Sequence, residues 1–211
     1  MLVHKKLFLY SLSISAGQAA ELTDLVGKDP KDITFALIEN AADVEEGSEN
    51  WLGGFRNMLQ SNGYQLEQLD LRNWLNRQKA LREKLSDKDV IWIGGGNTFY
   101  LRWILRETGA DKIIAELISQ GKVYAGWSAG AIVAGPTLQY IDAMENLTDV
   151  PEIIWEGLNL TNIVVVPHLD SSDFSEVAKK VNLRLENTGY DVVPLDDNQV
   201  LIINGNEQKI I

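Results

Sequence analysis

Short apolar runs of strand length alternate along the chain with segments in which apolar residues recur every three or four positions. The first pattern is typical of strands buried on both faces, and the second of helices that pack on one side. The predicted strands cover residues 6–12, 33–38, 65–69, 90–93, 123–125, 163–166 and 200–203. This alternation predicts an α/β fold, a three-layer sandwich in which a mostly parallel central sheet has helices on both faces.

Two of the predicted helices have clear ends. One leads into the strand at 123–125 and ends near Gly121, at a left-handed cap position, and its apolar stripe consists of Ile113, Ile114, Leu117 and Ile118. The other follows the strand at 163–166, begins at Asp173 as a capping residue and ends at Gly189. The longest irregular stretch covers residues 137–162, and a loop of that length is often functional.

The composition is that of an ordinary globular protein. The 211 residues are 45% hydrophobic and 23% charged, which predicts a single domain over residues 1–211 with its own core. Lys5, Lys6 and the apolar residues after them superficially resemble a secretory signal, but Ser11 and Ser13 interrupt the run and favour a first buried strand. The sequence contains no run of about 18 apolar residues, which is the length that a membrane span requires. We expect a cytoplasmic protein.

Charge and residue counts narrow the chemistry. A net charge of −11 repels phosphate backbones and anionic headgroups, which argues against nucleic-acid and membrane partners. The chain has no cysteine, so thiol catalysis and thiolate metal sites are excluded. It has two histidines, His4 and His168, which is few for a zinc site. We therefore expect no metal and no cofactor.

The strongest motif is the segment from Gly126 to Gly130, which reads G-W-S-A-G and follows a predicted strand. It matches the nucleophile elbow G-x-S-x-G, in which a sharp turn between strand and helix presents the serine and requires small neighbours. Ser128 would be the nucleophile, and the free amide of Ala129 could stabilise an oxyanion. The alternative is a tight turn with a purely structural role.

A second motif, Gly94-Gly95-Gly96-Asn97-Thr98, leaves the end of the strand at 90–93. Ligands bind at this edge of a parallel sheet, and consecutive glycines let backbone amides approach a substrate oxygen. Gly95 or Gly96 could therefore supply a second oxyanion donor. The alternative is a phosphate-binding loop, although the spacing fits neither G-x-G-x-x-G nor a P-loop.

A serine nucleophile needs a base and an acid that orients it. His168 follows the buried strand at 163–166 and is better placed than His4, which precedes the first strand. Several acidic residues could complete a triad, and their positions alone do not decide among Asp142, Glu145, Asp170, Asp173 and Asp196.

Taken together, the motifs resemble the serine-type aspartyl dipeptidases and their cyanophycinase relatives. The resemblance rests on I-G-G-G-N-T-F at 93–99, Y-A-G-W-S-A-G-A at 124–131, Pro-Thr at 136–137 and Pro-His at 167–168. It implies a fold like that of the class I glutamine amidotransferases. It also implies that Ser128 is the nucleophile and His168 the base, with an oxyanion hole formed by Ala129 and either Gly95 or Gly96.

For the acid, the resemblance points to two positions. The family's aspartate after the elbow corresponds to Asp142, displaced by one position, and its acidic residue in the late turn corresponds to Asp196. We favour Asp196, because a turn between packed elements holds a carboxylate better than a long loop does.

One segment departs from the family's pattern. Aspartyl dipeptidases carry an arginine after the histidine that seats the acidic substrate side chain, whereas residues 169–180 contain none. The sequence therefore predicts a serine peptidase for short peptides, without implying aspartyl specificity. The alternatives are an esterase or amidase acting on a non-peptide acyl substrate and a catalytically silent binding protein. The oligomeric state stays open, with a homodimer among the alternatives.

Overall fold

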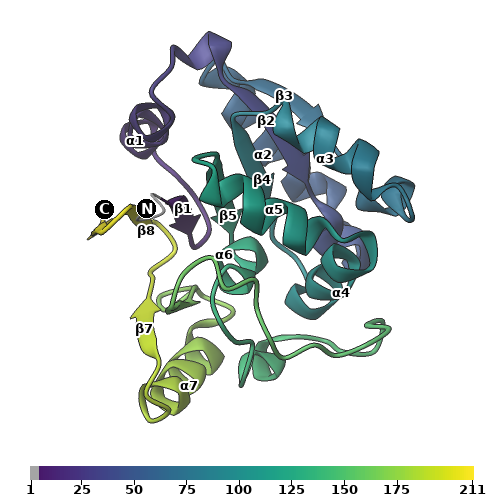
Figure 1. The fold of residues 1–211 in the computed structure, drawn as a ribbon. Helices are drawn as coiled ribbons and strands as arrows, with labels where there is room; N and C mark the ends of the chain where they lie inside the picture. The colour runs from purple at the N-terminus through teal and green to yellow at the C-terminus, as the bar shows by residue number, and fades with distance from the viewer. Residues whose placement is uncertain (1–4) are drawn as a thin grey trace.

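The computed structural model describes residues 5–211, so His4 lies outside the described residues. Within them, a seven-stranded sheet has the order β3-β2-β4-β5-β1-β8-β9 (Figure 1). Its strands are β1 (Lys6–Tyr10), β2 (Thr34–Ile38), β3 (Gln65–Gln68), β4 (Val90–Ile93), β5 (Val123–Trp127), β8 (Val200–Asn204) and β9 (Glu207–Ile210). The five strands from β3 to β1 are parallel, and β8 and β9 add an antiparallel edge. The predicted α/β fold with a mostly parallel central sheet is confirmed.

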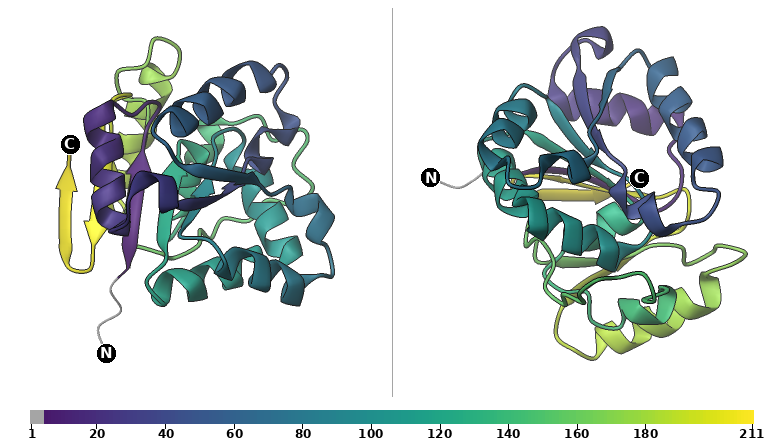
Figure 2. Two further views of the ribbon diagram at one scale, coloured as in Figure 1. Left: turned by 90° about the horizontal axis from the view of Figure 1, so that it is seen from above. Right: turned by 90° about the vertical axis from the view of Figure 1, so that its right-hand side faces the viewer.

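Helices cover both faces of this sheet (Figure 2). One face packs against α1 (Ala16–Val26) and α2 (Glu49–Ser61). The other face packs against α3 (Gln78–Ser86), α4 (Thr98–Thr108), α5 (Ala110–Ser119) and α6 (Ala129–Val133). Successive side chains of a strand point to opposite faces of the sheet, so each strand contributes to the core on both faces. In β1, Leu7 and Leu9 lie on the face covered by α3 to α6, whereas Phe8 and Tyr10 lie on the face covered by α1 and α2.

The helix predicted before β5 is α5. Its apolar stripe is buried, and Gly121 just beyond it has φ +97°, the left-handed conformation expected after a helix end. The strand predicted at the N-terminus is β1, which lies in the middle of the sheet between β5 and β8.

A smaller unit lies beside the central sheet (Figure 1). The predicted strand β6 (Ile163–Val166) pairs with β7 (Asp191–Pro194) in a separate parallel sheet, and α7 (Ser175–Glu186) packs on it. Sequence pattern did not indicate β7 or β9, because β7 is half-exposed and ends in proline while every β9 residue is exposed. The predicted cap at Asp173 is also wrong. Phe174 occupies the cap position, and Ser171 Oγ instead accepts the backbone N–H groups of Asp173 and Phe174.

The remaining ordered pieces are short. They are the 3₁₀ helices η1 (Pro30–Asp32), η2 (Asn40–Val44), η3 (Leu71–Trp74) and η4 (Ile141–Met144). The long stretch at 137–162 contains η4 and is closed by a bridge between Thr137 and Glu156. Among residues 5–211, no helix combines the length and apolar character that a membrane span requires.

The carboxyl ends of the central strands lie side by side. Tyr10 at the end of β1 is paired with Trp127 at the end of β5, and Ile93 at the end of β4 is paired with Gly126. The residues that follow these strands therefore meet at one edge of the sheet, where ligands bind in folds of this type.

Candidate active site

Ser128 occupies a sharp turn between β5 and α6. Its backbone has φ 49° and ψ −110°, a conformation that a non-glycine residue rarely adopts, and its N–H donates to the carbonyl of Tyr10 at 3.0 Å. A Cβ on Gly126 would lie 2.4 Å from the carbonyl oxygen of Gly130, and one on Gly130 would lie 2.2 Å from that of Ile93. Both glycines of the motif are thus required by close packing, and the turn has the geometry of a nucleophile elbow.

His168 reaches this serine from the smaller sheet. It follows β6 by two residues, has φ 71°, and places Nε2 2.9 Å from Ser128 Oγ. The imidazole is buried, and Phe174 lies beside it with ring centroids 5.5 Å apart. The sequence prediction that Ser128 and His168 lie together agrees with this geometry.

The carboxylate next to His168 belongs to Asp197. Its Oδ1 lies 2.6 Å from His168 Nδ1, and its own N–H donates to Asp170 Oδ1 at 2.7 Å. The sequence favours Asp196, but neither Asp196 nor Asp142 makes a hydrogen bond to His168 within residues 5–211, and Asp142 is exposed in η4.

The carboxylate that contacts His168 comes from the turn that the sequence favours, but it belongs to Asp197 and not to Asp196. Consecutive side chains of a turn point in different directions, and the backbone path that decides between Asp196 and Asp197 depends on packing. Asp196 uses its N–H to donate to Gln199 Oε1 at 2.9 Å, which holds the turn.

Ser11 is a site residue that sequence reasoning missed. Its fully buried side chain accepts the backbone N–H of His168 at 2.8 Å and donates to Asp197 Oδ1 at 3.2 Å. It therefore holds both His168 and Asp197. The available signal was a polar residue directly after a buried strand, at the edge where the other motifs end.

The glycine loop after β4 lies against Ser128. A Cβ on Gly95 would lie 3.3 Å from Ser128 Cβ and 3.2 Å from the ring of Trp127. Gly96 has φ +127°, and a Cβ there would lie 2.3 Å from the carbonyl oxygen of Ala41. Within residues 5–211, the amides of Gly95 and Gly96 donate to no backbone carbonyl, so they remain available to a ligand. Asn97 ends the loop by capping α4, its Oδ1 accepting the N–H of Tyr100 at 3.0 Å.

Ser128 and His168 line a cavity of about 440 Å³, which we term the catalytic cavity. Its wall includes two carboxylates, Glu45 and Glu145. Glu145 Oε1 accepts the N–H of Thr98 at 3.2 Å and its hydroxyl at 2.5 Å. Burial raises the pKa of Glu145 to about 7, and the charge of Glu45 adds to this rise.

The family model that matches the chain is that of peptidase family S51, and it covers residues 13–211. The chain belongs to peptidase family S51. Family membership makes it a serine peptidase, in agreement with the resemblance stated from the motifs.

This S51 peptidase has relatives that match it over most of its length and a solved structure that shares its fold. An uncharacterized peptidase of Pasteurella multocida is 35% identical over 98% of this chain and 97% of its own length. Peptidase E of a Nostoc strain is 29% identical over 78% of this chain and 65% of its own. The crystal structure of a putative peptidase E from Listeria monocytogenes superposes with a TM-score of 0.85 at 30% identity, covering 99% of this chain and 98% of the other.

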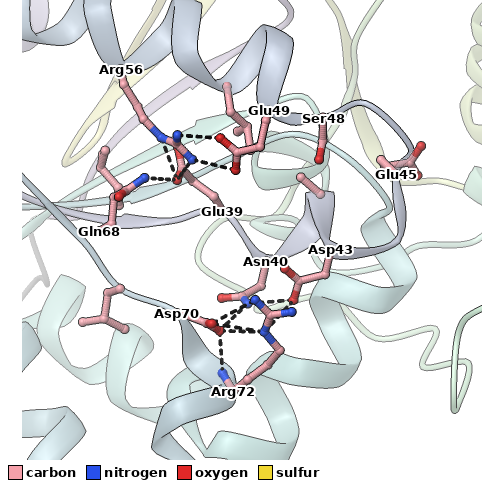
Figure 3. Close-up of a pocket in the computed structure, with 14 residues that line it drawn as sticks. Glu39, Asn40, Asp43, Glu45, Ser48, Glu49, Arg56, Gln68, Asp70 and Arg72 are labelled. Atoms are coloured by element: carbon pink, nitrogen blue, oxygen red, sulfur yellow. Dashed lines mark hydrogen bonds and ion pairs between the residues drawn. The ribbon is translucent and has the colours of Figure 1, made fainter.

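A second cavity of about 370 Å³ lies at the same edge of this S51 chain, beyond β2 and β3, and we term it the arginine cavity (Figure 3). Arg56 binds Glu39 and Glu49 at 2.8 and 2.9 Å. Arg72 binds Asp70 at 2.9 Å and approaches Asp43 at 3.4 Å. Glu45 contributes to the walls of both cavities.

Proposed function

We propose that this S51 peptidase hydrolyses short peptides through a triad of Ser128, His168 and Asp197. The observation that carries the proposal is the continuous chain of hydrogen bonds from Ser128 Oγ to His168 Nε2 and from His168 Nδ1 to Asp197 Oδ1, at 2.9 and 2.6 Å. A serine hydroxyl is a weak nucleophile alone, and this arrangement supplies the base that activates it.

The reaction follows from the positions of these atoms. Ser128 Oγ attacks the scissile carbonyl while His168 Nε2 takes the hydroxyl proton, and the imidazolium then gives that proton to the leaving amine as the C–N bond breaks. Water, deprotonated by the same nitrogen, then hydrolyses the acyl-enzyme and restores Ser128. Asp197 holds the tautomer with the proton on Nδ1 and stabilises the imidazolium. Ser11 fixes the Asp197 and His168 groups relative to each other.

The oxyanion would be stabilised by backbone amides. Ala129 follows the nucleophile at the start of α6, and the unpaired amides of Gly95 and Gly96 lie on the loop that contacts Ser128. Donors of this kind stabilise charge that develops only during reaction, and losing one typically costs about 10²-fold to 10³-fold in turnover.

Two observations support a short peptide as the substrate. The catalytic cavity, at about 440 Å³, is within the size range of small-molecule sites rather than of extended clefts. Curated relatives in the family carry the name peptidase E. The absence of arginine in residues 169–180 gives no support to aspartyl selectivity.

A fluorophosphonate probe tests the nucleophile directly. We expect stoichiometric labelling of the wild type at Ser128 and none of Ser128→Ala. Paired panels of dipeptides and simple acyl esters then test the substrate class, and we expect the dipeptides to give the higher kcat/KM. Labelling that persists in Ser128→Ala would contradict the proposal, and turnover of esters alone would favour the esterase alternative.

A further inference from the structure

Apart from His168, the ionisable side chains in the described wall of the catalytic cavity are acidic. Among the described residues that line it, Glu45 and Glu145 are carboxylates, and neither lysine nor arginine is present. A substrate carboxylate placed here would meet like charges and no cation. The cavity therefore favours a substrate that is neutral or positively charged on this side.

One carboxylate oxygen of Glu145 accepts no hydrogen bond from the described residues. Glu145 Oε1 is held by the N–H and the hydroxyl of Thr98, two residues beyond Gly96 in the loop that contacts Ser128. Its Oε2 has no hydrogen-bond partner within residues 5–211, although the side chain is partly buried. This oxygen is not among the buried atoms without a partner, so it is open to the cavity and can accept a hydrogen bond from a ligand there.

Glu145 is rigidly placed because its loop is attached at more than one point. Asn97 Nδ2 donates to the carbonyl of Asn146 at 2.6 Å, next to the contacts of Glu145 with Thr98. Glu45 lines the same cavity as Glu145, and its negative charge adds a small part of the rise in the pKa of Glu145. A cation between them would relieve the repulsion.

The same cavity has an aromatic wall. Trp127 stacks on Phe55 with ring centroids 3.6 Å apart and meets Trp51 edge-on at 5.2 Å. The buried indole N–H of Trp127 has no hydrogen-bond partner within the described residues. Aromatic surfaces of this kind accept apolar side chains and also favour a nearby ammonium group.

We propose that Glu145, assisted by Glu45, binds the α-ammonium group of a dipeptide whose apolar amino-terminal side chain lies on the aromatic wall formed by Trp51, Phe55 and Trp127. The substrate class is thus dipeptides with a free amino terminus and an apolar first residue, rather than aspartyl dipeptides. The inference rests on the proposed peptidase function of Ser128.

Four chromogenic substrates test which positive group binds: the p-nitroanilides of leucine, N-acetyl-leucine, aspartate and N-acetyl-lysine. The leucine and aspartate substrates carry an α-ammonium group, the N-acetyl-lysine substrate carries only a side-chain ammonium group, and the N-acetyl-leucine substrate carries neither. We expect the leucine substrate to exceed N-acetyl-leucine by about 10-fold or more in kcat/KM, the value of one charge-assisted hydrogen bond. We expect it also to exceed the aspartate substrate, whose side-chain carboxylate would meet the like charges of Glu45 and Glu145. Higher activity on N-acetyl-lysine than on leucine would contradict the α-ammonium assignment, because it would place a side-chain ammonium there instead.

Glu145→Gln isolates the charge. A glutamine oxygen can still accept both hydrogen bonds from Thr98, while the free carboxylate oxygen becomes an amide NH₂. We expect KM for the leucine substrate to rise about 10-fold with kcat within about 3-fold, and the constants for the N-acetyl substrates to stay unchanged, as for loss of uniform binding. Glu46→Gln is the matched control, because Glu46 adjoins Glu45 in sequence, is exposed and does not line the cavity.

The outcomes distinguish this inference from the function on which it rests. A preference for aspartate over leucine, or an equal effect of Glu145→Gln on free and acetylated substrates, would overturn the inference while fluorophosphonate labelling upholds the nucleophile. Absence of both labelling and turnover would overturn the proposed function and the inference with it. Thermal unfolding of each variant checks that it is folded.

Discussion

The two cavities at the carboxyl edge of the sheet share Glu45 but differ in how their charges are satisfied. In the arginine cavity, Arg56 and Arg72 meet carboxylates on each side, and Asn40 donates to both Asp43 and Asp70 (Figure 3). In the catalytic cavity, Glu145 keeps an oxygen without a donor and, among the described residues, no cation lines the wall. Charged side chains that are paired with each other stabilise the fold, whereas a carboxylate oxygen without a hydrogen-bond donor is available to a ligand.

The backbone shows the same contrast. Ser128 and His168, both in the catalytic cavity, have positive φ, and none of the described residues lining the arginine cavity does so. Strained conformations persist where the surrounding structure over-determines them, and they concentrate at functional sites. We therefore expect substitutions in the catalytic cavity to change activity, and those in the arginine cavity to change stability.

The largest effect is expected for Ser128→Ala. Removing the nucleophile of a triad costs on the order of 10⁶-fold in turnover, while the smaller side chain leaves the elbow intact. Steady-state kinetics on a dipeptide, with thermal unfolding alongside, measures both. More than a tenth of wild-type turnover remaining would refute the role of Ser128.

The next effect concerns the acid. Asp197→Asn removes the charge that holds the His168 tautomer, and we expect a loss of roughly 10⁴-fold in kcat. The matched controls are Asp196→Asn, one position earlier in the same turn, and Asp142→Asn. Both should change kcat by less than about 10-fold, since they retain the whole triad. A larger loss in either control than in Asp197→Asn would move the acid to that position.

The arginine cavity gives the opposite expectation. Arg56→Met leaves Glu39, whose side chain is 11% exposed, without its cation, and we expect about 2 to 3 kcal/mol of destabilisation with little change in kcat. Arg82→Met is the control, because the Arg82–Glu116 pair is exposed and such pairs contribute little to stability. Urea unfolding compares the two variants. A loss of activity without a loss of stability would show that the arginine cavity also serves the substrate.

The smallest effect is a pH-dependent gain in stability. Burial raises the pKa of Glu145 from 4.5 to about 7, so its protonated form is favoured in the folded state and stability is lost as pH rises through that interval. Thr98, which donates to it, and Glu45, which repels it, are the groups that modify this shift. Glu145→Gln should therefore gain about 1 to 3 kcal/mol relative to wild type between pH 4 and pH 8. Unfolding at both pH values measures this, and a constant difference would contradict the raised pKa.

Much of the site could be predicted because its motifs are local. The elbow and the glycine loop each require small residues at fixed spacing, and the sequence alone displays those residues at Gly126, Gly130 and Gly96. His168 could be placed because β6 is a strongly apolar run that ends just before it. An exposed edge strand such as β9 has no apolar run in its sequence, so the sequence does not indicate it.

The sequence by itself determined the α/β alternation and predicted Ser128, His168 and the glycine loop as site residues, because each depends on the residue types within a few positions. Only the tertiary structure decided that Asp197 rather than Asp196 meets His168, that Ser11 joins them, and that Glu145 reaches the cavity from a loop far along the chain. The contacts of Asp197 with His168 and Ser11 connect residues 29 and 186 positions apart, so the partners are chosen by how β1, β6 and the turn after β7 pack together. Local pattern carries no information about that packing, since the same turn could present either aspartate.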